Sequence, residues 1–156
     1  MSGTILLTRE RRVRASAQTA IKAPPAVVYG WVTSPDRVVT WVKDLMESRP
    51  LQDGVTLEVG ARSVEVLKIG GKRVEVPAEV TALEPGRLIE NRLETPDGPA
   101  VSRVLITSTS AGSAVTQSME AAFTGMRLVP TSILTKLLAR RLNGDLRRLK
   151  NLVENS

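Results

Sequence analysis

A chain of 156 residues suits one compact domain that buries its own apolar core. It contains no cysteine and no histidine, which excludes disulfides, thiolate and imidazole metal sites, and catalytic triads that use either residue. Its formal charge of +6 comes largely from residues 126–156, which carry seven Lys or Arg against two Asp or Glu. The apolar run near the N-terminus is too short for a signal peptide or a membrane span, so we expect a soluble, cytoplasmic protein.

The first predicted elements are a strand and two short helices. Residues 13–21 alternate between apolar and polar side chains, as in a half-buried strand. Pro24 and Pro25 end this strand and suit the first turn of a helix through residues 26–32. Pro35 starts a second short helix in the same way.

From Leu45 onward the sequence alternates with a period of two, which predicts an antiparallel meander of six strands. Its clearest turn is Gly70-Gly71, between two alternating runs, because a two-residue hairpin turn requires positive φ angles. Turn signals near Asp97-Gly98 and Gly112 separate the later runs, which are residues 87–94, 101–109 and 114–123.

The chain ends in a predicted amphipathic helix of roughly six turns. Its polar face carries Lys136, Arg140, Arg147 and Lys150, which could attract nucleic acid, the ribosome or anionic headgroups by charge. No aromatic residue lies between them to stack on bases, so we favour a solvated face. The apolar arc opposite comprises Leu134, Leu138, Leu142, Leu146, Leu149, Leu152 and Val153.

The order of these elements resembles the START-like, or Bet v 1-like (SRPBCC), superfamily, in particular its polyketide cyclase/dehydrase and lipid transport group. The matching segments are IKAPPAVVYGWVTSPDRVVTW, VGARSVEVLKIGGKRVEV, EVTALEPGRLIENR and DLRRLKNLVE. The resemblance implies an α+β helix-grip fold in the order β-α-α-β6-α, with an antiparallel curved sheet wrapped around the long C-terminal helix and an internal cavity. We expect residues 13–156 to form this single domain after a flexible arm over residues 1–12. Members bind lipids, sterols or polyketides, and some catalyse cyclisation or dehydration.

Strand alternation predicts which side chains face that cavity. On the last strand, Gln117, Met119 and Phe123 share one face, and Asn91 faces inward on an earlier strand. A buried amide needs a partner, which would be either a ligand or a neighbouring chain atom or water. The predicted ligand contacts are Trp41, Asn91, Arg103, Gln117, Met119, Phe123, Leu134 and Leu138. Gln117 and Asn91, and in addition Arg92 or Arg103, could hold the polar ends of the ligand.

Three of the four aromatic residues are clustered at Tyr29, Trp31 and Trp41. They could line the mouth of the cavity, but we favour a packing role, because buried aromatic residues serve cores more often than sites. Trp41 is the best ligand candidate among them, since it lies where the second helix meets the meander.

Glu65 and Tyr29 are the weak candidates for catalysis. If Gly70-Gly71 is a two-residue turn, Glu65 pairs with Val76 and could face the cavity, where it would act as a general acid or base. A slip of one residue would put it in solvent. We favour the solvent position, because glutamate is rarely buried.

Asp145 raises a similar question on the last helix. Ideal helical geometry places it in the leucine arc, where Arg141 and Arg148 could pair with it. We favour a bend at Gly144 that turns Asp145 outward, because a glycine weakens a helix locally.

These features predict a protein that binds a hydrophobic small molecule, such as a lipid or a polyketide-like ligand. An alternative is a cyclase or dehydratase in which Glu65 or Tyr29 moves protons. A third is a regulator that docks on RNA or the ribosome through the basic helix. The scattered carboxylates lack metal-ligand spacing, so we predict no metal and no cofactor. We expect a monomer or a homodimer, without a transmembrane segment.

Overall fold

The computed structural model describes residues 11–52, 56–124 and 128–156. After the first strand come two short helices, then six strands, then one long helix. In order these are β1 (Arg11–Ile21), α2 (Pro25–Thr33), α3 (Pro35–Trp41), β2 (Leu45–Pro50), β3 (Arg62–Ile69), β4 (Lys72–Glu84), β5 (Leu88–Thr95), β6 (Gly98–Thr109), β7 (Gly112–Phe123) and α4 (Thr131–Glu154). Within the described residues, no helix is long and apolar enough to cross a membrane.

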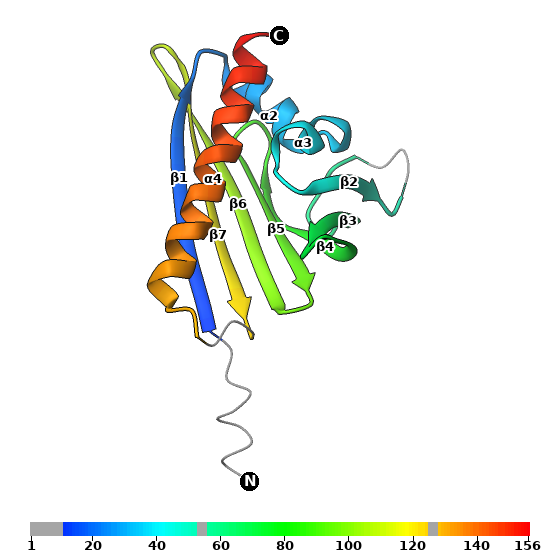
Figure 1. Ribbon diagram of the computed structural model, residues 1–156. Helices are drawn as coiled ribbons and strands as arrows, with labels where there is room; N and C mark the ends of the chain where they lie inside the picture. The colour runs from blue at the N-terminus through cyan, green and yellow to red at the C-terminus, as the bar shows by residue number, and fades with distance from the viewer. Residues whose placement is uncertain (1–10, 53–55, 125–127) are drawn as a thin grey trace.

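The seven strands form one antiparallel sheet in the order β1-β7-β6-β5-β4-β3-β2. Figure 1 shows α4 running along β1 and β7 on one face of this sheet, with α2 and α3 covering the same face near the C-terminus. The strands β2 to β4 curl toward the helices, so the sheet is concave on the helical side. The predicted α+β helix-grip architecture is confirmed.

The β3–β4 hairpin has the tight turn that the sequence predicts. Gly70 and Gly71 have φ angles of 58° and 79°, the positive values that a two-residue hairpin turn requires. Ile69 therefore pairs with Lys72, and Glu65 pairs with Val76. Register shifts in β2 and β4 interrupt the neighbouring ladders, and such irregularities bend strands and deepen the curvature of the sheet.

The first strand starts two residues earlier than predicted. Arg11 and Arg12 belong to β1 and pair with Phe123 and Ala122 of β7. The Arg12 guanidinium lies 2.8 Å from the carboxylate of Glu120 on the neighbouring strand, which supports pairing at this edge. The remaining part of the predicted arm, residues 1–10, lies outside the described residues.

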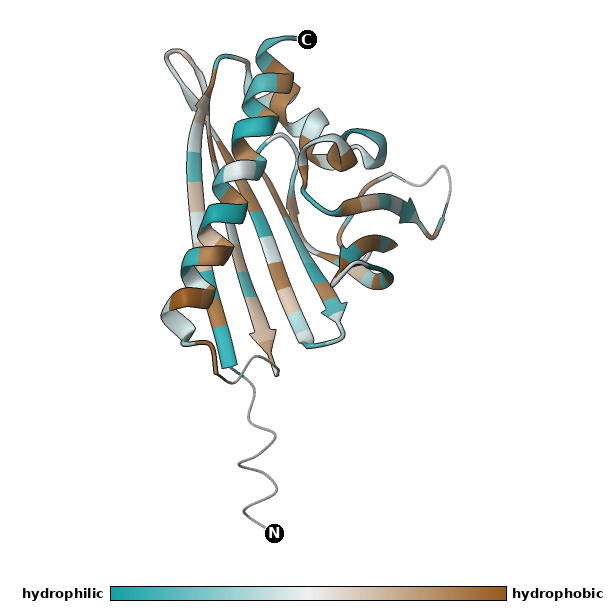
Figure 2. Ribbon diagram, in the orientation of Figure 1, coloured by the Kyte–Doolittle hydropathy of each residue, from teal (hydrophilic) through white to brown (hydrophobic). Residues whose placement is uncertain are grey.

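The core lies where α4 crosses the sheet. Leu142, Leu146 and Leu149 of α4 are each at most 1% exposed and join a cluster that includes Ile21 and Val28. Figure 2 shows hydrophobic and hydrophilic residues alternating along α4, as expected for a helix with one buried face. Full burial of a leucine side chain contributes about 2 kcal/mol, so this stripe holds the helix on the sheet.

The expectation that Asp145 turns outward at Gly144 is wrong. The helix is continuous from Thr131 to Glu154, and Asp145 stays inside the leucine arc with 1% exposure. The carboxylate can stay buried because Lys43 and Arg148 donate hydrogen bonds to it.

Candidate ligand-binding cavity

A cavity of about 1020 Å³ lies between the concave face of the sheet and the helices α3 and α4. Its volume is at the upper end of the range for small-molecule sites. Most of its wall is apolar, and a few polar side chains interrupt it at separate points. The apolar lining includes Val32, Val38, Trp41, Leu45, Leu67, Val80, Ile89, Leu93, Val104, Met119, Phe123, Leu138 and Leu142.

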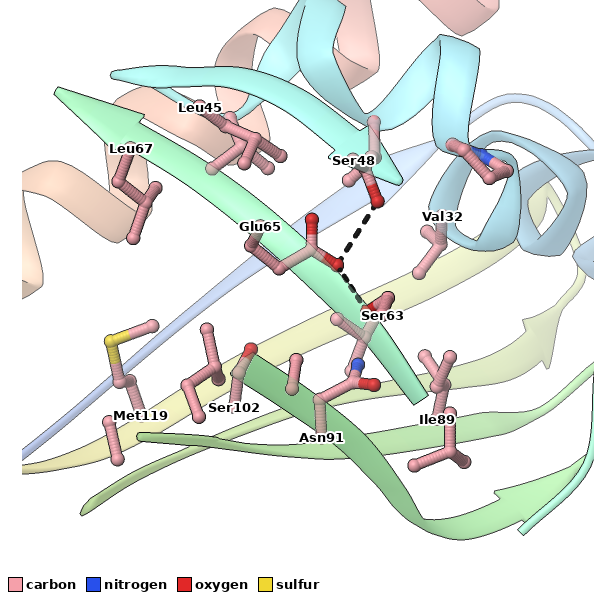
Figure 3. A pocket seen from close by; sticks show the side chains of 18 of the residues that line it. Val32, Leu45, Ser48, Ser63, Glu65, Leu67, Ile89, Asn91, Ser102 and Met119 are labelled. Atoms are coloured by element: carbon pink, nitrogen blue, oxygen red, sulfur yellow. Dashed lines mark hydrogen bonds between the residues drawn. The ribbon is translucent and has the colours of Figure 1, made fainter. Parts of the chain in front are cut away.

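Glu65 lies in the wall of this cavity, so the expectation that it faces solvent is wrong. The tight Gly70-Gly71 turn fixes the register that turns its side chain inward. Ser48 of β2 and Ser63 of β3 donate hydrogen bonds to Oε1 of Glu65, at 3.0 and 2.9 Å (Figure 3). The other oxygen, Oε2, is buried and accepts no hydrogen bond from any residue that the structure describes.

Three polar side chains lie on β5, β6 and β7, across the cavity from Glu65. Asn91 and Ser102 are register partners on β5 and β6, and Figure 3 shows both pointing toward the space below Glu65. Gln117 of β7 is 4% exposed, and its Oε1 has no hydrogen-bond partner among the described residues. The alternation predicted for β7 is confirmed, because Gln117, Met119 and Phe123 all line the cavity.

The aromatic residues divide between the cavity and the core. Trp41 is 2% exposed and lines the cavity, but its indole N–H donates to the Trp31 carbonyl at 3.1 Å, so the ring offers a ligand mainly apolar contact. Tyr29 does not line the cavity and packs against the core instead. Burial raises the pKa of its hydroxyl, which makes proton release harder. Its position outside the cavity lining disfavours a role in proton transfer to a ligand there.

The expectation that Arg92 or Arg103 holds the polar end of a ligand is wrong, because neither side chain lines the cavity. Ser102 and Val104 of β6 line the cavity, so Arg103 between them points to the outer face, where it is exposed. Arg103 lies 3.5 Å from Glu90, and Arg92 lies 2.8 Å from Glu94.

Two leucines of α4 were also predicted to contact the ligand. Leu138 lines the cavity. Leu134 is buried at 4% exposure but is not part of the lining, because it lies one turn nearer the start of α4.

Asp145 closes the cavity where α3, β2 and α4 meet. Its Oδ1 accepts hydrogen bonds from the Lys43 backbone N–H, at 3.0 Å, and from the Arg148 side chain. Arg141 donates to the Lys43 carbonyl at 2.6 Å, so α4 holds both sides of this turn. Burial raises the pKa of Asp145, and the Lys43 N–H and the two arginines oppose that rise without cancelling it.

The basic residues predicted on the polar face of α4 do not line the cavity. Lys136, Arg140 and Arg147 surround a shallow hollow on the outer surface of the helix. Lys150 instead turns toward the sheet, where its Nζ donates to the Ala20 carbonyl at 2.6 Å and pairs with Glu154 at 2.9 Å. Binding of RNA or the ribosome through this face stays a prediction.

Residues 12–154 match the sequence model of a family described as polyketide cyclase / dehydrase and lipid transport. The chain belongs to this family. No curated protein matches the chain. The family and its fold support hydrophobic ligand binding or cyclase-type activity in general terms.

Several solved structures are similar in fold to this chain. A protein of unknown function from Staphylococcus aureus, SA2116, is 12% identical with a TM-score of 0.75, covering 94% of this chain and 96% of that one. Ara h 8.0201 is 10% identical with a TM-score of 0.68, covering 94% and 100%. The di-domain ARO/CYC protein StfQ, from the steffimycin biosynthetic pathway, is 14% identical with a TM-score of 0.72, covering 92% of this chain and 51% of that one. At these identities the likeness concerns the fold.

Ser48, Ser63 and Ser102 are site residues that sequence reasoning missed. Alternation places Ser63 on the same face as Glu65, so that serine could have been found from the β3 pattern. Ser48 could not, because its pairing with Glu65 depends on a register shift in β2 between Leu45 and Glu47. Across the described ranges, no cluster of three or more acidic side chains is arranged to hold a metal ion.

Proposed function

We propose that the protein binds a hydrophobic small molecule, of lipid or polyketide-like character, in the cavity between the sheet and α4. The observation that carries this proposal is the cavity itself, an apolar space of about 1020 Å³ with a few inward polar groups. A cavity of this kind is the usual form of a small-molecule site, in which apolar contacts supply affinity and polar groups fix orientation.

The energetic argument rests on apolar burial. Each Å² of apolar ligand surface removed from water contributes about 25 cal/mol. Strands and helices supply much of the lining, and the connection between β2 and β3 supplies another part. Asn91, Ser102 and Gln117 lie together on one wall, and Glu65 lies on the other. A ligand with polar groups at its ends would therefore take one orientation in the cavity.

A cavity-filling variant tests this proposal. Ser102→Phe places a ring inside the cavity, whereas Arg103→Phe adds the same ring on the outer face of the same strand. Native mass spectrometry of the freshly purified protein should show a lipophilic adduct on the wild type and on Arg103→Phe, and none on Ser102→Phe.

The same three proteins can be compared by thermal unfolding with added lipophilic compounds. Ligands that bind the native state raise the melting temperature, so the wild type and Arg103→Phe should respond and Ser102→Phe should not. A panel of lipids and polyketide-like compounds that stabilises none of them, together with a bare wild-type protein, would contradict the proposal.

A second candidate, a cyclase or dehydratase, is favoured by the inward position of Glu65. A carboxylate held by two serines in an apolar wall can take a proton from carbon beside a ligand carbonyl, and such general base catalysis contributes roughly 10²- to 10⁴-fold. Glu65→Gln should then abolish turnover of a poly-β-ketone substrate, while circular dichroism and ligand binding remain. Turnover by Glu65→Gln at the wild-type rate would exclude this role.

A further inference from the structure

Glu65 lacks the partners that a carboxylate in an apolar wall normally has. Both of its hydrogen bonds come from neutral serine hydroxyls, and both end on Oε1. Within the described parts of the chain, no Lys or Arg nitrogen lies within 4.0 Å of either oxygen, and Oε2 is buried without a donor. An ionised carboxylate in such a place is stabilised by an added positive charge or an added donor.

The basic residues that border the cavity are already engaged elsewhere or face away. Arg62 pairs with Glu79 at 3.2 Å, and Arg141 bonds the Lys43 carbonyl. Lys68 follows Glu65 by three residues on β3, so its side chain lies on the opposite face of the strand, where it is exposed. Among the described residues, then, the negative charge of Glu65 has no cation assigned to it.

We propose that the ligand of this cavity is a hydrophobic amine, bound in its protonated form with its ammonium group at Glu65. This inference rests on the proposed function and names the ligand class of the same cavity. An ammonium group supplies both the missing donor and the missing positive charge, whereas an alcohol supplies a donor alone. A fatty acid would bring a second carboxylate toward Glu65 and is disfavoured by repulsion.

The carboxylate can meet such a ligand with little rearrangement. The terminal torsion of a glutamate is broad, so a small rotation presents an oxygen to the cavity while Ser48 or Ser63 follows it. The apolar side chains around it, such as Leu67 and Met119 in Figure 3, would contact the alkyl part of the ligand. Gln117 does not favour an amine over an alcohol or a carboxylate, because its amide can both donate and accept a hydrogen bond.

Three ligands of one chain length test the proposal, namely decylamine, decanol and decanoate. Binding to the wild-type protein is measured by calorimetry at neutral pH and moderate salt. Decylamine should bind about tenfold more tightly than decanol, the effect of one charge-assisted contact, and decanoate should bind most weakly. The net charge of +6 would favour the anion at the surface, so a preference for the amine has to arise inside the cavity.

Variants locate the preference. Glu65→Gln should lose the tenfold advantage of decylamine while its affinity for decanol stays the same, which also shows that the cavity is intact. Glu65→Asp keeps the charge and should keep most of the advantage. Glu75→Gln is the matched control, because it removes an exposed carboxylate on the neighbouring strand β4 that does not line the cavity, and it should change neither affinity.

The outcomes separate this inference from the proposed function. Equal binding of amine and alcohol, tightest binding of decanoate, or an amine preference that survives Glu65→Gln would each overturn the amine assignment and leave hydrophobic binding in place. Failure of the wild type to bind any of the three would overturn the amine assignment and count against a hydrophobic binding site as well.

Discussion

Glu65 and Asp145 are two carboxylates in the wall of one cavity, and they differ in what surrounds them. Asp145 accepts from a backbone N–H and from the Arg148 guanidinium, and together with Arg141 it fastens α4 to the turn after α3. Glu65 has two serine hydroxyls on one oxygen and no donor on the other. A carboxylate whose partners all come from the fold is part of the structure, whereas one with an unsatisfied oxygen in a cavity wall can gain a partner from a ligand.

Replacement of each carboxylate by alanine gives the largest expected contrast. Asp145→Ala removes the acceptor of the partly buried Lys43 N–H and the partner of Arg148, and should lower the free energy of unfolding by about 2 kcal/mol at neutral pH. Glu65→Ala releases two serine hydroxyls that can turn to the cavity, so its cost should stay below about 1 kcal/mol. Urea denaturation of both variants measures the difference. Equal losses would mean that Glu65 is as firmly integrated as Asp145.

The comparison also shows what the sequence could predict. The hairpin turn at Gly70-Gly71 was sufficient to derive the register that turns Glu65 inward. The general rarity of buried glutamate argued for the opposite position, and it failed here because a cavity lies on that side of the sheet. Local geometry was a better guide at this position than residue statistics.

For Asp145 helical spacing predicted the pair with Arg148 that the structure shows, but it did not predict the other donor. Helical periodicity placed it in the leucine arc, but its main donor is the backbone of Lys43, 102 residues earlier in the chain. Alternation likewise predicted β7 correctly, whereas on β6 the alternation of Ser102 and Val104 into the cavity leaves Arg103 on the outer face. Contacts between distant segments depend on the closed fold, and they decide which polar residue is structural.

Gln117 extends the contrast to a neutral side chain. Its buried Oε1 has no partner among the described residues, so the native protein carries the cost of desolvating it. Gln117→Leu should therefore raise the free energy of unfolding by about 1 kcal/mol in the absence of ligand. Met119→Leu, on the same face of β7, is the matched control and should change stability less, because it conserves volume and removes no amide. Destabilisation by Gln117→Leu comparable to that of Asp145→Ala would show that the amide is held by the fold.

The smallest expected effect is the pH dependence that Asp145 confers. Burial is the largest influence on this carboxyl and raises its pKa above the ordinary value of 3.8, so the folded state binds the proton more tightly than the unfolded state does. The contribution of the Asp145 carboxyl to the free energy of unfolding is therefore fully present below pH 3.8. It is lost as the pH rises through the raised pKa.

Glu120 and Glu154 contribute in the opposite direction. Hydrogen bonds from Arg12 and from the Lys22 N–H lower their pKa values, so their stabilisation is present at higher pH and is lost as the pH falls. The free energy of unfolding of the wild type, measured against pH, combines the contributions of Asp145, Glu120 and Glu154. Subtracting the same profile of Asp145→Ala leaves the contribution of Asp145. That difference should be largest in acid, decline above pH 3.8 and then level off. A difference that grows with rising pH would mean that Arg148 and the Lys43 N–H outweigh burial, and that Asp145 is held as an ion.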